Sequence, residues 1–250
     1  MKKGIIAILN EKGGVGKTAT TEALNDGLRL RGKKVLCIDM DLQTNLTAAM
    51  SADRDKPNII DLINGEATPA EAIQDTGRAH IIAGSRSLAT LSGSPAALRD
   101  ALQATRCPVN TYDYVLIDCP PSMGLASLNA LTAATAAIIP TTADAFSLQA
   151  LGNVWQTVQT VQAQANEALY ISGIVLTRWS SRTIITRELT AMIEQAAAQM
   201  GTRVFNTRVR ECTALREAEA NRESIFDYAP RSHTAKDYNS LINELLEDVK

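Results

Sequence analysis

The sequence is poor in the residues that build metal centres and disulfide frameworks. Its 250 residues include only two histidines and four cysteines. The cysteines show no C-x-x-C spacing and no cluster of histidines accompanies them, which argues strongly against a structural zinc site. We expect all four thiols to be reduced and merely structural, because thiols stay reduced in the cytosol.

Long hydrophobic runs are also lacking. The longest apolar stretches, such as Gly4 to Leu9 and Ala133 to Ile139, fall far short of the ~20 residues that a membrane-spanning helix needs. The opening Met1-Lys2-Lys3 leads straight into a strand-length run, without a signal-peptide cleavage pattern. We therefore expect a cytoplasmic protein.

The last predicted helix has an apolar face but lacks the charge of a membrane anchor. Its polar face carries Glu244, Glu247 and Asp248, which anionic lipids would repel. We expect this helix to pack against the core, and we expect no membrane partner.

Excess charge of one sign is small. The formal net charge is −2, with 21% charged and 45% hydrophobic residues, which is typical of a soluble globular protein. This balance argues against a generally basic protein that coats nucleic acid. The distribution is uneven, because nine arginines against seven acidic residues lie between Arg178 and Arg231. That segment holds the candidates for contacts with phosphate groups.

Strand-like and helix-like stretches alternate along the chain. The strand-like runs are continuously apolar, as in a sheet buried on both faces. The sequence therefore predicts an α/β fold with a doubly wound, mostly parallel sheet flanked by helices, forming one domain over residues 1–250. Ligands of such sheets bind beyond the carboxyl ends of the strands. The predicted strands cover 4–9, 34–39, 80–83, 114–118, 136–140, 170–177 and 203–206, and the predicted helices cover 16–31, 95–105, 125–134, 148–166, 186–200, 215–221 and 235–249.

A glycine-rich loop follows the first predicted strand and opens the first predicted helix. Its glycines let backbone N–H groups turn toward phosphate oxygens, and the N-terminus of the following helix favours negative charge. In such a loop Lys17 reaches the β- and γ-phosphates, and the hydroxyl of Thr18 ligates Mg²⁺. The predicted nucleotide-binding residues are Lys12, Gly13, Gly14, Val15, Gly16, Lys17, Thr18 and Ala19.

This loop departs from the strict P-loop pattern in a specific way. Glu11 stands where that pattern requires glycine, and a second lysine, Lys12, lies inside the loop. The string Lys-Gly-Gly-Val-Gly-Lys-Thr resembles the deviant Walker A motif of the ParA/MinD family of ATPases, and the resemblance extends along nearly the whole chain. It implies a P-loop NTPase with ATP and Mg²⁺ as cofactors. It also implies that Lys12 reaches the nucleotide of a second subunit, so that ATP binding and homodimerisation become one event.

Two aspartates close the second predicted strand. Carboxylates at this edge, beside the phosphate loop, are placed to orient water or metal. The resemblance to a family string Asp-x-Asp-Pro-Gln implies that Asp41 positions the hydrolytic water, as a catalytic residue beside Lys12 and Lys17. Two residues depart from the family: Leu42 stands where proline is usual, and Thr44 where glycine is common.

A further aspartate ends the predicted strand 114–118. Four apolar residues followed by Asp118 form a Walker B arrangement, in which the carboxylate holds Mg²⁺ through a water or a threonine contact. The Asp-Cys-Pro-Pro-Ser string that begins at Asp118 again resembles the ParA family. The predicted metal-binding set is therefore Thr18, Asp118 and Asp39, the last lying farther from the ion.

The arginines of the C-terminal half are candidates for DNA contacts. A strand begins at Gly4, so we expect a small family member without an N-terminal helix-turn-helix domain, and such members are thought to bind DNA nonspecifically. The resemblance of Arg182-Thr183 to a family segment implies a DNA contact for Arg182. A second family arginine aligns with Ala214.

Nearby arginines could replace that second family arginine. The candidates are Arg208, Arg210 and Arg216. Interleaved glutamates leave open that these arginines form only surface ion pairs. Arg178, Val209 and Arg210 are candidates for contacts with adenine.

The resemblance implies an ATP-dependent switch for the partition of plasmid or chromosomal DNA. It implies a homodimer in the ATP state, nonspecific DNA binding in that state, and slow hydrolysis stimulated by a ParB-like centromere-binding or adaptor protein. We expect the protein to associate with the nucleoid. Two alternatives stay open at this point: a ParA-like ATPase that positions a non-DNA cargo, and an ATP-dependent metabolic synthetase with the same loop.

Overall fold

The computed structural model describes residues 4–104, 107–180 and 184–247. The strands are β1 (Gly4–Ile8), β2 (Val35–Asp39), β3 (Ile73–Asp75), β4 (His80–Ile82), β5 (Tyr114–Asp118), β6 (Ala136–Thr141), β7 (Tyr170–Trp179) and β8 (Val204–Arg210). The helices are α1 (Lys17–Leu30), α2 (Asn45–Ala49), α3 (Ile59–Asn64), α4 (Pro69–Ala72), α5 (Ala97–Gln103), α6 (Leu125–Ala133), α7 (Ser147–Gln164), α8 (Ile184–Gln199), α9 (Thr213–Asn221), α10 (Ile225–Tyr228) and α11 (His233–Glu247), with short 3₁₀ turns at Arg86–Thr90 and Pro108–Thr111.

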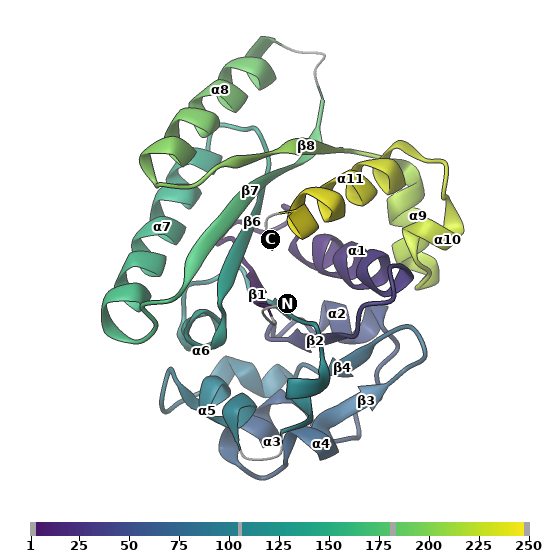
Figure 1. Ribbon diagram of the computed structural model, residues 1–250, viewed down its shortest axis with the longest axis vertical. Helices are drawn as coiled ribbons and strands as arrows, with labels where there is room; N and C mark the ends of the chain where they lie inside the picture. Colours follow the sequence, from purple (N-terminus) through teal and green to yellow (C-terminus); the bar gives the residue numbers. More distant parts are fainter. Residues whose placement is uncertain (1–3, 105–106, 181–183, 248–250) are drawn as a thin grey trace.

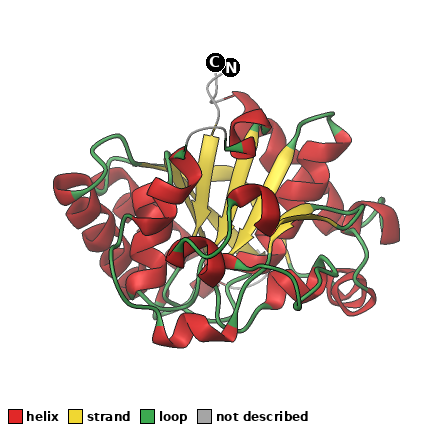
Figure 2. Ribbon diagram, turned by 90° about the horizontal axis from the view of Figure 1, so that it is seen from below, coloured by secondary structure: helices red, strands yellow, loops and turns green. Residues whose placement is uncertain are grey.

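The strands of the described residues form a single sheet in the order β3-β4-β2-β5-β1-β6-β7-β8. Every neighbouring pair is parallel except β3 and β4, which are antiparallel. Helices cover both faces of the sheet (Figures 1 and 2). The predicted doubly wound, mostly parallel α/β fold is confirmed.

Each face of the sheet has its own hydrophobic core. Successive side chains of a strand point to opposite faces. On β1, Ile6 and Ile8 join the core beneath α1 and α11, whereas Ala7 joins the core on the other face, beneath α6 and α7. These side chains are at most 4% exposed. Burial on both faces explains why the strands read as continuous apolar runs.

The segment between β2 and β4 contains elements that the hydrophobic pattern does not reveal. Helices α3 and α4 are six and four residues long, which is too short for a helical repeat to emerge. Both begin with a capping box, from Asn58 with Asp61 and from Thr68 with Glu71. Local capping of free backbone N–H groups therefore replaces amphipathic patterning here.

Strand β8 is longer than predicted, so the expected end at residue 206 is wrong. The strand lies at the edge of the sheet, and carboxylates of α11 accept hydrogen bonds from its backbone. Glu244 accepts from the amides of Asn206 and Thr207 at 2.8 and 2.7 Å, and Asp237 accepts from the amide of Arg210 at 3.0 Å. These bonds satisfy donors that an edge strand otherwise exposes.

Helix α11 packs against the core as predicted. Leu241, Ile242 and Leu245 are at most 4% exposed. Among the residues that the structure describes, no helix combines the length and the apolar character that a membrane crossing requires.

Candidate functional site

The carboxyl ends of β1, β2 and β5 meet beside the glycine-rich loop. Asp118 at the end of β5 is in register with Ile8 of β1 and with Asp39 of β2. The loop then joins β1 to α1. Gly14 and Gly16 have φ angles of 74° and 81°, a left-handed region that favours glycine. The sequence therefore predicted this loop through residues that its backbone conformation requires.

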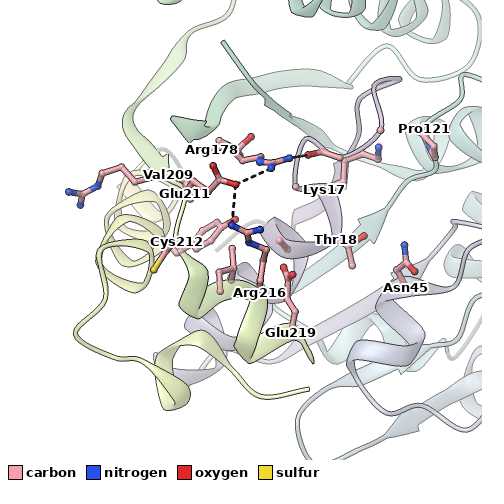
Figure 3. A pocket seen from close by; sticks show the side chains of 18 of the residues that line it. Lys17, Thr18, Asn45, Pro121, Arg178, Val209, Glu211, Cys212, Arg216 and Glu219 are labelled. Atoms are coloured by element: carbon pink, nitrogen blue, oxygen red, sulfur yellow. Dashed lines mark hydrogen bonds and ion pairs between the residues drawn. The ribbon is translucent and has the colours of Figure 1, made fainter. Parts of the chain in front are cut away.

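A cavity of about 500 Å³ opens over this loop. Figure 3 shows its walls, with the N-terminus of α1 on one side and the β8–α9 segment on the other. Its lining includes Gly13, Gly14, Gly16, Lys17, Thr18, Ala19 and Asp41. Most of the predicted nucleotide-binding residues thus lie together, with Val15 buried behind them.

The two lysines of the loop have different environments. Lys17 is 7% exposed, and its ammonium donates to the carbonyl oxygen of Lys12 at 3.2 Å. Burial lowers the pKa of Lys17, while nearby acids, chiefly Asp118, oppose the shift. An anionic group in the cavity would complete the charge balance of this ammonium.

Lys12 points away from this cavity and is bound within its own subunit. Its ammonium forms an ion pair with Asp144 and donates to the hydroxyl of Thr142 at 3.1 Å. Partial burial would raise the pKa of Asp144, but the bonds from Lys12 and Thr142 outweigh it and lower the pKa to about 2. Sequence reasoning missed Asp144, although it lies just beyond the carboxyl end of β6.

The predicted metal ligands lie at the base of the loop. The hydroxyl of Thr18 donates to Asp118 at 2.7 Å, and that of Thr21 donates at 3.4 Å. Asp118 is 1% exposed, and burial and the adjacent Asp39 carboxylate raise its pKa well above the usual range.

This donor set fits Mg²⁺. A divalent cation would stabilise the ionised form of the buried Asp118 carboxylate. Within the described residues no group of three His, Cys, Asp or Glu side chains could hold a metal ion. Mg²⁺ needs only one or two protein oxygens, such as those of Thr18 and Asp118, because water and substrate phosphates complete its shell.

Asp39 is engaged in the local backbone. Its carboxylate accepts from the amide of Asp41 at 3.0 Å, and from the amide and hydroxyl of Thr47 at 2.9 and 2.7 Å. Burial raises the pKa of Asp39, although these hydrogen bonds oppose the shift. Asp39 therefore orders the loop that carries Asp41. Asp41 itself lines the cavity and accepts from the amide of Gln43 at 2.9 Å.

The opposite wall of the cavity carries charged side chains from β7, β8 and α9. Arg178 donates to Glu211 at 2.9 Å and to the carbonyl oxygen of Gly14 at 3.4 Å, and Arg216 lies 3.7 Å from Glu211 (Figure 3). Val209 and Arg210 line the same cavity. The three residues named as candidates for adenine contacts are therefore brought together beside the phosphate loop.

The arginines predicted to contact DNA are engaged in ion pairs where the structure describes them. Arg182 lies outside the described residues. Arg208 pairs with Glu194 at 2.6 Å, and Arg210 pairs with Asp237 at 2.5 Å. Arg210 and Arg216 also line the nucleotide-sized cavity. The DNA-contact assignment for these residues stays a prediction.

The fold and the site define a P-loop nucleotide-binding protein with a second lysine in its loop. A family model described as an AAA domain matches residues 3–171. The chain is 34% identical over 250 residues to the chromosome-partitioning ATPase Soj of Thermus thermophilus, covering 98% of this chain and 96% of that relative. The chain belongs to the ParA family of ATPases.

Solved structures agree with this assignment of the fold. Cobyrinic acid a,c-diamide synthase from Mycobacterium smegmatis, with bound ATP analogue and magnesium, is 27% identical, with a TM-score of 0.84 over 100% of this chain and 96% of that one. The cell division ATPase MinD of Pyrococcus furiosus is 26% identical, with a TM-score of 0.81 over 100% of both chains.

Proposed function

We propose that this chain is an ATP-dependent dimerising switch that partitions plasmid or chromosomal DNA. Residues 1–250 act as one ATPase domain with ATP and Mg²⁺ as cofactors. The relative named as a chromosome-partitioning ATPase supports the process, because the alignment covers nearly all of both chains. The protein works in the cytoplasm and associates with the nucleoid.

The hydrolytic site is built from the loop and the strand ends. Backbone N–H groups of residues 13–19 surround the phosphates, and the buried Lys17 neutralises charge on the β- and γ-phosphates. Thr18 and Asp118 would hold Mg²⁺, and Asp39 would act from farther away, through the loop that it orders. Mg²⁺ supplies charge neutralisation of the phosphates when bound. Asp41 orients the attacking water.

The observation that carries the switch is the position of Lys12. Its side chain is directed out of its own nucleotide cavity, toward a surface hollow that it lines with Pro121, Met123 and Phe146. A cation on that face can add charge to a nucleotide held by a second copy of this chain. Dimerisation then depends on ATP, because the added attraction requires phosphates on the facing subunit.

DNA binding follows from the dimer in this proposal. Arginines suit phosphate contacts because the guanidinium donates in a planar fork. Arg182 and Arg216 are the side chains to test first, because Arg216 is 67% exposed and its pairing with Glu211 is loose at 3.7 Å. A ParB-like centromere-binding or adaptor protein would stimulate hydrolysis and so release the dimer from DNA.

Retention on nonspecific DNA with ATP, with ADP and without nucleotide tests the proposal. Wild type should bind only with ATP, and binding should fall steeply with salt because phosphate contacts release counterions. Asp41→Ala should keep this binding while losing hydrolysis. Absence of DNA binding in every nucleotide state would remove the DNA-partition function. An Arg182→Ala/Arg216→Ala double variant that retains full binding would overturn only the contact assignment.

The similarity to an amide-forming synthase supports a second candidate, an ATP-dependent metabolic synthetase. The two functions differ in what stimulates hydrolysis. A partition ATPase should respond to DNA together with a partner protein. A synthetase should respond to a small carboxylate substrate and should not require Lys12.

A further inference from the structure

The loop between β2 and α2 holds Asp41 against the nucleotide cavity. Its far end is anchored by Thr47, which donates to the Asp39 carboxylate through its amide and hydroxyl. The same hydroxyl accepts from the amide of Gly84 at 2.7 Å. These bonds fix the start of α2, but Asp41 lies six residues before Thr47, so the middle of the loop needs its own support.

The middle of this loop contains a strained residue. Thr44 has φ 54° and ψ 35° and is 5% exposed. A β-branched residue is a clear outlier in this left-handed region, which glycine enters freely. Its amide donates to the carbonyl oxygen of Asp41 at 2.9 Å, and its own carbonyl accepts from Ala48 at 3.1 Å. The strained backbone therefore links Asp41 directly to α2.

Strain of this kind persists only where the surroundings hold it. The side chain of Thr44 does not cap α2; its hydroxyl instead accepts from the guanidinium of Arg54 at 3.1 Å. Arg54 lies just beyond α2 and lines a surface groove together with Ser51 and Arg222. A charged donor makes a stronger hydrogen bond than a neutral one.

We propose that Arg54 is a positioning residue for hydrolysis. Its hydrogen bond to Thr44 holds the left-handed turn and, through it, the Asp41 carboxylate. The inference rests on the proposed function, because it gives Asp41 a role in orienting water. A glycine at position 44 could form the same turn but would offer no side chain for Arg54 to hold. Threonine is strained in this turn, but its hydroxyl accepts the hydrogen bond from Arg54, which we call the tether.

Steady-state hydrolysis of ATP separates positioning from nucleotide binding. Arg54→Ala should lower kcat about tenfold, the effect of one strong hydrogen bond, and change KM less than about twofold. Thr44→Ser retains the acceptor and should keep kcat near that of wild type. Arg222→Ala removes a second arginine of the same groove, one that comes from the end of α9, and is the matched control with unchanged kcat.

A double-mutant cycle assigns the effect to the pair. In a Thr44→Gly background, which relieves the strain and removes the hydroxyl, Arg54→Ala should change kcat less than about twofold. An equal loss in both backgrounds, a rise in kcat, or a loss that appears in KM would overturn the proposal. Thermal unfolding of each variant identifies losses caused by incomplete folding.

Hydrogen exchange tests the tether without any activity. In the nucleotide-free protein, amides of residues 41–47 should exchange faster in Arg54→Ala than in wild type and Arg222→Ala. Unchanged exchange would overturn the tether itself. If wild type does not hydrolyse ATP while residues 41–47 still exchange faster in Arg54→Ala than in wild type, the proposed function is overturned and the tether stands, so the two failures are distinguishable.

Discussion

The phosphate loop and the β8–α9 segment line the same cavity from opposite sides. The structure of the loop is set by neighbouring residues in the sequence, whereas that of the β8–α9 segment is set by residues far apart in the sequence. The loop functions through consecutive residues whose backbone shape is set locally, as the left-handed Gly14 and Gly16 illustrate. In β8–α9 the charged groups are defined by partners from distant elements. Arg210 binds Asp237 of α11, and Glu211 binds Arg178 of β7.

This difference shows why a local excess of arginine in the sequence does not by itself predict a surface that binds phosphate groups. Between Arg178 and Arg231 the sequence has two more arginines than acids, but several of these arginines are satisfied inside the fold. Arg208 pairs with Glu194 and also lies over the ring of Trp179, 5.5 Å from its centroid. Contacts with a partner would have to compete with these internal interactions.

The largest effect is expected for a substitution in the phosphate loop. Lys17→Ala removes the buried ammonium and should reduce ATP hydrolysis by about 10²–10³-fold, as loss of one preorganised charge contact does. Nucleotide binding should weaken as well, because no other buried cation replaces it among the residues lining the described cavity. A hydrolysis assay with Lys34→Ala, which removes an exposed lysine, as the control checks this. Hydrolysis within tenfold of wild type would contradict it.

The second lysine of the loop should separate dimerisation from binding. Lys12→Ala should weaken the proposed ATP-dependent dimer at least about thirtyfold, because truncating one member of an interfacial charge contact costs about 2 kcal/mol or more. Binding of a nucleotide to the monomer should change little. Sedimentation with ATP and with ADP measures both states. A normal ATP dimer in this variant would show that Lys12 serves only its own subunit.

The sequence predicted the parts of the molecule that follow from local rules. Strand β5 spans the predicted residues, and the loop and its glycines were found from their pattern. Helices α3 and α4 were not predicted, because they are shorter than the roughly 11–18 residues over which a helical hydrophobic pattern can be recognised. The ion pair of Lys12 with Asp144 joins residues 132 positions apart, so no spacing rule points to it. The sequence showed that Thr44 departs from the family, but only the structure shows that its backbone is left-handed.

In the β8–α9 segment, two arginines of β8 form ion pairs that should differ in their contribution to stability. Arg210→Ala leaves the 9% exposed Asp237 without the guanidinium that donates to it twice. We expect a loss of about 1.5–3 kcal/mol in the free energy of unfolding, typical of hydrogen bonds to charged groups. Arg208→Ala should cost less than about 1 kcal/mol, because its partner Glu194 is 47% exposed, against 11% for the side chain of Asp237, and water can solvate the carboxylate left behind.

Denaturant unfolding measures both variants, with DNA retention measured beside it under conditions where each variant is folded. A stability loss for Arg210→Ala with normal DNA retention would make Arg210 structural. Reduced DNA retention without any stability loss would restore it to the DNA-contact set.

The smallest expected effect concerns Asp144, which links the loop to α7. Its pKa in the folded protein is lowered to about 2, below the value of about 3.9 typical of unfolded chains. The ionised form therefore adds stability above about pH 4, and that stability is lost as the pH falls through about 2. The side chains are 28% and 39% exposed, so water screens the pair and its contribution should stay below about 1 kcal/mol.

Comparing wild type with Asp144→Asn by denaturant unfolding at several pH values measures this contribution. Wild type should be slightly more stable at pH 6, and the difference should shrink between pH 4 and pH 2 as Asp144 takes up its proton. The asparagine retains the side-chain shape and the oxygen that accepts from Phe146 and Ser147, while its neutral amide replaces the oxygen that accepts from Lys12 and Thr142. A difference that grows on acidification would mean that Lys12 is not held by Asp144. The cation would then already be free to face a second subunit before ATP binds.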